Sequence, residues 1–231
     1  MRVGTQSILW GVHQFILHPI LVYKAWTRIY ARRPSLRETL CIFAHDLGYI
    51  GKTTMDGPDG LLHPEFGARL VRWLLGFDSE PFQNLVRYHS RAYAKLFSTK
   101  PSVLCLPDKL AVLLYPNWLY IALGRASGEI AEYKAAMSAS NVPDHIWIHD
   151  LKSITLTWTI DYTKSTPILQ DRLYEEFLLP QSRPHRESAW STGARLGTFL
   201  SGLKTRTSRA LLIPFSITPQ RFNIDNGTPS R

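Results

Sequence analysis

Cysteine is scarce in this chain, since only Cys41 and Cys105 occur among its 231 residues. Both lie inside apolar runs, which indicates core thiols in a reducing compartment and excludes a framework of disulfides. Long apolar runs are lacking too, because His13 and His18 interrupt the most apolar stretch, residues 8–26. We therefore expect a cytoplasmic protein without a membrane-spanning segment.

Acidic residues are outnumbered by basic ones. The chain has 27 Lys and Arg against 18 Asp and Glu, and its formal net charge is +9. Such an excess favours anionic partners, for example nucleotides or nucleic acid, and carries no information about the fold. It is concentrated in residues 181–231, which hold eight basic residues and two acidic ones. We expect this tail to supply at most nonspecific attraction to nucleic-acid phosphates.

Alternation of apolar and polar residues, the pattern of strands, is rare, and helical spacing dominates. Residues 154–160 (ITLTWTI) suit either a helix or a strand. Residues 51–60 are a turn-rich loop. The sequence predicts helices over residues 8–31 with a bend at His18–Pro19, 35–46, 63–75, 79–89, 101–115 with a kink at Pro107, 118–137 with an interruption near Ser127–Gly128, 144–162 and 169–179.

These patterns predict an all-α fold in three parts. A helical core covers residues 1–140, and additional helices over residues 141–180 pack on it. Residues 181–231 are rich in Ser, Thr, Arg, Gly and Pro, and only short apolar clusters occur there. We expect this basic C-terminal extension to be partly disordered.

The helix over residues 35–46 ends in chemistry-bearing side chains. Ser35 and Glu38 have the spacing of a capping box, which predicts the start of this helix. The apolar run that follows ends in the pair His45–Asp46, and Gly48 stops it. An imidazole beside a carboxylate at a helix end suits a buried metal site, although the dipeptide alone is a weak signal because any histidine can precede an aspartate.

Other residues of ligand type lie where the helices of a bundle can bring them to this pair: His18, His63, His89 and Asp108. Taken singly, each histidine is more often a core residue, and the aspartate can be a helix cap. The ordered set is what predicts a metal site. Imidazole together with carboxylate suits one or two divalent transition ions, of Mn, Fe, Zn or Co, better than it suits calcium.

His18, the His45–Asp46 pair and Asp108, in this order and on separate helices, resemble the HD-domain superfamily of metal-dependent phosphohydrolases. The resemblance covers residues 14–115, with the motifs HPILVYKA, FAHDLGY, HPEFGARL, RYHSR and PDKLA. HPEFGARL and RYHSR resemble two extra motifs of the binuclear branch. That branch includes bacterial symmetrical diadenosine tetraphosphate hydrolases and HD-GYP cyclic di-nucleotide phosphodiesterases.

The resemblance implies an HD-domain helical bundle over residues 1–140 and a metal-dependent hydrolase. Its substrate would be a nucleotide or other phosphorylated small molecule, whose phosphoester or phosphoanhydride bond is cleaved by metal-activated water. In this scheme Asp46 bridges two ions. The implied ligands of the first ion are His18, His45, Asp46 and Asp108, and those of the second are Asp46, His63 and His89.

The chain departs from the family pattern at two places. Tyr49 stands where many relatives have lysine, and Lys52 follows three residues later. The Gly-Tyr-Pro signature of the HD-GYP branch is missing, which argues against cleavage of cyclic di-nucleotides.

Basic residues beside the motifs are candidate phosphate clamps, because arginine and lysine bind phosphate oxygens. We expect Lys52, Arg91 and Lys109 to act in catalysis together with Asp46, and Arg87 is a further candidate. His13 lies five residues before His18 and therefore not on the same helical face, so we expect it to be structural.

The alternative function is a non-catalytic HD-fold module that binds a nucleotide, or nucleic acid through the basic tail. The presence of a ligand at every motif favours the enzyme, because a scaffold does not need an open metal site.

Overall fold

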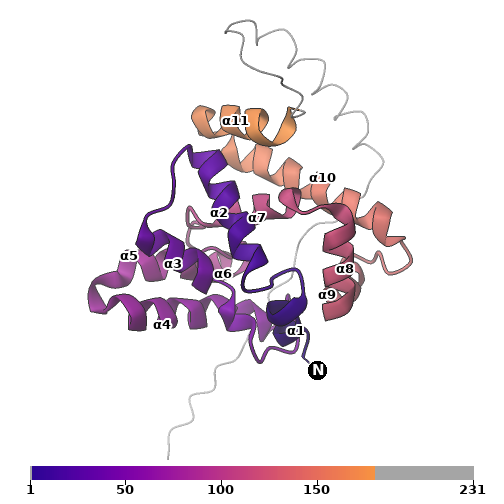
Figure 1. The fold of residues 1–231 in the computed structure, drawn as a ribbon, viewed down its shortest axis with the longest axis horizontal. Helices are drawn as coiled ribbons and strands as arrows, with labels where there is room; N and C mark the ends of the chain where they lie inside the picture. The colour runs from indigo at the N-terminus through magenta and orange to yellow at the C-terminus, as the bar shows by residue number, and fades with distance from the viewer. Residues whose placement is uncertain (1, 180–231) are drawn as a thin grey trace, which may run out of the picture. The chain divides into compact units, whose positions relative to one another are not determined.

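The computed structural model describes residues 2–179 of the chain, and all regular elements in this range are helical (Figure 1). The prediction of an all-α fold is therefore confirmed for these residues, and the extension over residues 181–231 lies outside them. The α-helices are α1 (Val3–Trp10), α2 (Leu17–Tyr30), α3 (Leu36–Ala44), α4 (His63–Leu75), α5 (Glu80–Arg87), α6 (Arg91–Leu96), α7 (Cys105–Leu114), α8 (Asn117–Ser127), α9 (Glu129–Ala136), α10 (Asp144–Thr163) and α11 (Pro167–Leu173). Short 3₁₀ turns η1 (Leu47–Tyr49), η2 (Gly60–Leu62) and η3 (Phe77–Ser79) and a π-helical turn η4 (Tyr174–Leu178) complete the set.

The N-terminal helical region is broken earlier than the sequence predicts. The break covers residues 11–16, between α1 and α2, and not the predicted position at His18–Pro19. Pro19 lies in the first turn of α2, where a backbone N–H has no partner within the helix, so proline removes no hydrogen bond there. Pro107 likewise lies in the first turn of α7, where proline removes no hydrogen bond of the helix. The prediction of a kink at this residue is therefore wrong.

Other boundaries differ by a few residues. Helix α5 ends at Arg87, two positions before the predicted end at His89, and α6 was not predicted. Helix α7 begins at Cys105, later than the predicted residue 101. The stretch 154–160, for which a strand remained open, is part of α10.

The start of α3 has the predicted capping box. The Ser35 hydroxyl accepts a hydrogen bond from the backbone N–H of Glu38, and the Glu38 carboxylate accepts one from the N–H of Ser35. Arg32 also donates two hydrogen bonds to this carboxylate, at 2.7 and 2.8 Å. These bonds, chiefly those from Arg32, lower the pKa of Glu38 to about 2. The carboxylate therefore stays charged and stabilises the first turn over the ordinary pH range.

Helices α2 and α7 pack against each other at the centre of the described residues (Figure 1). Helices α3, α4 and α5 pack together on one side, and α10 and α11 cover α7 and α2. The core between them is apolar, with Trp26, Ile42 and Trp147 almost completely buried. Within residues 2–179, none of the helices has the length and apolarity that a bilayer-spanning segment needs.

We expect Ser35→Ala to lower the free energy of unfolding by about 1 kcal/mol, because the first turn of α3 loses its side-chain cap. Urea denaturation measures the change. Ser153→Ala is the matched control, because Ser153 is exposed within α10, and it should change the free energy by less than about 0.5 kcal/mol. Equal losses in the two variants would show that the capping box does not stabilise the fold.

Candidate metal centre

The first ligand group combines four buried side chains. His18 lies in the first turn of α2, Asp108 in the first turn of α7, and the pair His45–Asp46 directly follows α3. The Nε2 atom of His18 lies 3.1 Å from Asp108 Oδ1 and 3.3 Å from Asp46 Oδ2. His45 Nε2 lies 3.2 Å from the same Asp46 oxygen. Ligand atoms bound about 2.0–2.2 Å from one ion lie roughly 3.0–3.5 Å apart, so these distances fit a shared ion.

The second ligand group uses the other oxygen of Asp46. Its Oδ1 atom lies 3.5 Å from Nε2 of His63, the first residue of α4. It also lies 3.4 Å from Nε2 of His89, which follows α5. In each group the ligand atoms all lie within 4.8 Å of one another. The carboxylate of Asp46 therefore faces both groups, with one oxygen on each.

Backbone carbonyls determine which ring nitrogen faces the centre. The Nδ1 atoms of His45, His63 and His89 each lie 2.6–2.8 Å from the carbonyl oxygen of the residue three positions earlier. A carbonyl oxygen can only accept, so each Nδ1 carries the hydrogen. When such a ring is in its neutral form, it presents the lone pair of Nε2 to the centre. Burial and the neighbouring His89 hold the pKa of His63 well below its usual value, which favours its neutral ring.

The centre has the electrostatic character of a cation site. The Nε2 atoms of His63 and His89 lie 3.1 Å apart, and two lone pairs at this distance repel unless a proton or metal ion lies between them. Within the described residues, His45 Nε2 and Asp46 Oδ2 are buried and make no hydrogen bond. Burial lowers the pKa of His45, but Asp46 and Asp108 outweigh burial and raise it to about 10. The residues present therefore fit divalent ions, and the buried His and Asp groups could bind them.

The turn after Asp46 is shaped by Gly48 and Tyr49. A Cβ atom at Gly48 would lie 1.9 Å from the carbonyl oxygen of His63, so only glycine lets this turn approach the start of α4. The Tyr49 ring stacks on the His63 ring, with centroids 3.8 Å apart and an interplanar angle of 17°. At the position where the resemblance leads us to expect lysine, an aromatic ring therefore holds a ligand in place.

The predicted basic residues differ in how close they come to the ligands. Lys109 Nζ lies 2.9 Å from Asp108 Oδ2, and its side chain is one-third exposed. The Arg91 guanidinium lies 4.3 Å from the centroid of the Trp158 ring. Within residues 2–179, neither Lys52 nor Arg91 makes a hydrogen bond or ion pair with any of the six ligands, so their catalytic role stays a prediction.

Arg87 was a further candidate for binding the phosphate of the substrate, but in the structure its guanidinium binds other side chains. Its guanidinium lies 2.9 Å from the carboxylate of Glu65 and also donates to Asn84. This ion pair joins the end of α5 to the first turn of α4, which indicates a structural role.

His13 lies beside the centre, contrary to the expectation from its spacing. Its ring centroid lies 5.1 Å from that of His18 and 5.8 Å from that of Tyr49. Helical spacing does not apply between His13 and His18, because residues 11–16 form the break between α1 and α2. Glu129, which binds His13, was also missed, since no local pattern joins residues that are 116 positions apart.

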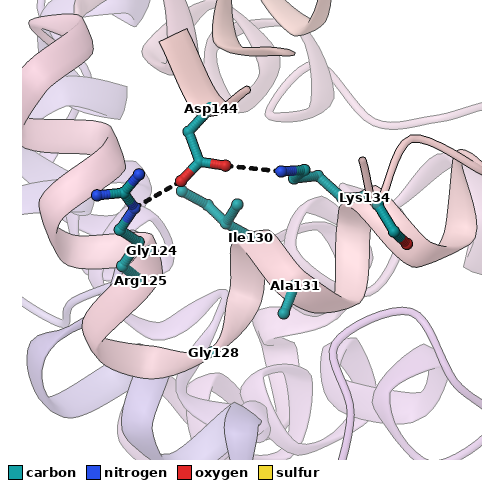
Figure 2. Close-up of a pocket in the computed structure, with 8 residues that line it drawn as sticks. Gly124, Arg125, Gly128, Ile130, Ala131, Lys134 and Asp144 are labelled. Atoms are coloured by element: carbon teal, nitrogen blue, oxygen red, sulfur yellow. Dashed lines mark hydrogen bonds and ion pairs between the residues drawn. The ribbon is translucent and has the colours of Figure 1, made fainter. Parts of the chain in front are cut away.

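A separate surface cavity of about 300 Å³ lies between α8, α9 and the start of α10 (Figure 2). Asp144 binds both cations that line it, with distances of 2.5 Å to Arg125 and 2.7 Å to Lys134. None of the six candidate ligands lines this cavity. An anionic substrate would have to compete with Asp144 for both cations, so the cavity is a weaker candidate site than the metal centre.

No family model, no curated protein and no solved structure matches the chain. The resemblance to the HD superfamily therefore rests on the motifs of the sequence. Function has to be inferred from the geometry and chemistry of the metal centre.

We expect the purified chain to bind up to two divalent transition ions, and Asp46→Ala to lose both, because Asp46 is common to the two ligand groups. His63→Ala should lose only the ion of the three-residue group. Elemental analysis after dialysis against Mn²⁺ measures the stoichiometry. His149→Ala is the control, since His149 is exposed on α10 and belongs to neither group. Full metal content in Asp46→Ala would contradict the assignment.

Proposed function

We propose that the chain is an HD-type metal-dependent phosphohydrolase, which cleaves a phosphoester or phosphoanhydride bond of a nucleotide-type substrate. The observation that carries the proposal is the Asp46 carboxylate, whose two oxygens face two separate sets of imidazole nitrogens. A carboxylate in this position can bridge two ions, which is the arrangement used in two-metal hydrolysis of phosphate esters.

The ligand sets would hold one ion each, with His18, His45, Asp46 and Asp108 on the first and Asp46, His63 and His89 on the second. When bound, the two ions supply a water of lowered pKa and neutralise negative charge on a phosphoryl oxygen. Three protein ligands leave positions for water or substrate at the second ion. Structural metal sites are instead closed by protein ligands, so the incomplete second group favours catalysis over a purely structural role.

The chain's own residues orient the ligands and bind the substrate. The carbonyls that accept from Nδ1 keep three imidazole rings in one orientation. Burial lowers the pKa of Lys109, but Asp108 outweighs burial and raises it, so the ammonium stays charged. Its partly exposed position beside a ligand suits a contact with a phosphate oxygen of the substrate.

An anionic substrate agrees with the charge of the chain. The formal net charge is +9, and a positive field raises the local concentration of phosphate-bearing molecules. The sequence has no Gly-rich phosphate loop and no serine nucleophile elbow. The proposed catalysis therefore depends on the metal centre, and the nucleotide part of the substrate follows from the HD resemblance.

We expect the Mn²⁺-loaded chain to hydrolyse at least one member of a panel of nucleoside phosphates, dinucleoside polyphosphates and cyclic nucleotides. Asp46→Ala should lower kcat/KM at least about 1000-fold, or about 4 kcal/mol of transition-state stabilisation. Chromatography of the products measures turnover and identifies the bond that is cleaved.

Asp150→Ala provides the matched control, because it removes an exposed carboxylate from α10 that lies outside both ligand groups. This variant should keep wild-type turnover. The proposal is wrong if the ion-loaded wild type hydrolyses no member of the panel, or if Asp46→Ala is as active as the control.

A further inference from the structure

A buried carboxylate lies next to the metal centre and outside both ligand groups. Glu129 is the first residue of α9, and it is completely buried. Its Oε1 atom accepts from the Ser7 hydroxyl at 2.6 Å and from His13 Nδ1 at 2.5 Å. Its Oε2 atom accepts from the Ser127 hydroxyl at 2.6 Å and from the Val12 N–H at 2.8 Å. A buried carboxylate is costly unless its oxygens are paired, and here each oxygen has two donors.

These donors keep Glu129 charged. Burial raises the pKa of this carboxyl, but His13 and the serine hydroxyls outweigh burial and lower it. An ionised carboxylate can only accept hydrogen bonds, so His13 Nδ1 carries a hydrogen and points at Glu129. The other ring nitrogen, Nε2, makes no hydrogen bond within residues 2–179.

The His13 ring lies beside a ligand of the first group and beside Tyr49, which packs on a ligand of the second group. It contacts His18, a ligand of the first group, with ring centroids 5.1 Å apart. It also lies 5.8 Å from Tyr49, which stacks on His63 of the second group. His13 itself belongs to neither ligand group. It is therefore a neighbour of the centre that would not bind an ion.

His13 is more exposed than the ligands. Its side chain is 18% exposed, whereas that of His18, which it contacts, is 2% exposed. A substrate has to reach the centre from a side that is open to solvent. His13 thus lies at a more exposed position than the ligand His18, with one nitrogen fixed by Glu129 and the other without a partner in the described residues.

His13 is one of four donors to Glu129. Ser7 of α1, Val12 of the break and Ser127 of α8 already join three segments through Glu129. They also provide at least one donor for each carboxylate oxygen. These segments are therefore joined through Glu129 without the imidazole, whereas the charge of the carboxylate is compensated by His13.

We propose that His13 donates a hydrogen bond from Nε2 to a phosphoryl oxygen of the substrate at the metal centre. Glu129, which forms an ion pair with Nδ1, would position the ring and favour the doubly protonated form that this donor role needs. His13 is then a catalytic residue and Glu129 a positioning residue. The inference rests on the proposed function for the presence of a phosphoryl group at the centre. The expected effect on phosphate affinity can be measured separately from turnover.

The test compares binding of inorganic phosphate to the Mn²⁺-loaded full chain by calorimetry in the wild type, His13→Ala, His13→Gln and Glu129→Gln. We expect His13→Ala to weaken binding about 10- to 100-fold, as for the loss of a hydrogen bond to a charged group. His13→Gln should recover part of the affinity, because its amide can also donate. Glu129→Gln should give an intermediate loss, since the ring remains but is no longer held by a charge.

Metal content and kinetics distinguish this role from a structural one. All His13 variants should keep the wild-type ion content, because His13 is not a ligand, and on any substrate that is hydrolysed they should lower kcat. His149→Ala is the control, because it removes an exposed histidine of α10, and it should leave phosphate binding unchanged. Ser7→Ala replaces Glu129→Gln if that variant does not fold, since it removes one donor from the carboxylate and should also weaken phosphate binding.

The inference is wrong if His13→Ala binds phosphate as the wild type does, if it loses ions, or if the ion-loaded wild type binds no phosphate. Failure of the proposed function looks different. In that case the wild type binds ions and phosphate but hydrolyses no substrate, and the comparison of phosphate affinities still decides the role of His13.

Discussion

The carboxylate of Asp46 is shared by both ligand groups, and the geometry of the whole centre depends on it. Four imidazole nitrogens lie within 3.5 Å of its two oxygens, and they come from α2, α4 and the residues that follow α3 and α5. A buried carboxylate without positive charge nearby would destabilise the fold by several kcal/mol, since charges are costly in an apolar interior. A positive charge at the centre would therefore serve two purposes. It would compensate the buried carboxylate of Asp46, which stabilises the fold, and it would take part in the proposed chemistry.

The ligands lie at helix ends, and the apolar core lies behind them. Asp108 in the first turn of α7 benefits from the positive end of that helix, and His63 opens α4. Packing of α2 against α7 brings His18 to Asp108, and packing of α4 against α3 and α5 brings His63 to His89. Helix packing thus fixes the backbone positions, while backbone carbonyls fix the rings. Together, helix packing and the carbonyl hydrogen bonds explain how side chains from five chain segments can converge on one site with defined positions and orientations.

Much of this arrangement could be predicted from local patterns in the sequence. The capping box of Ser35 and Glu38 predicted the start of α3, and Gly76 predicted the end of α4. The ligand types and their order predicted a metal site, and the structure brings all six residues together in two groups that could hold a metal ion. The break at residues 11–16 and the pairing of His13 with Glu129 could not be predicted, because Val12 and His13 of the break bind a residue more than 100 positions away, and such contacts leave no periodic pattern.

The distance along the chain between the ligands has a consequence for folding. His18 and Asp108 are 90 positions apart, and His63 and His89 are 26 positions apart. An ion bound by such residues closes long loops of the folded chain, and because the unfolded chain does not hold these ligands together, the free energy of ion binding would add to the stability of the fold. The two cysteines of this chain are both free and buried. Ions at the centre would thus provide the cross-links that its cysteines do not.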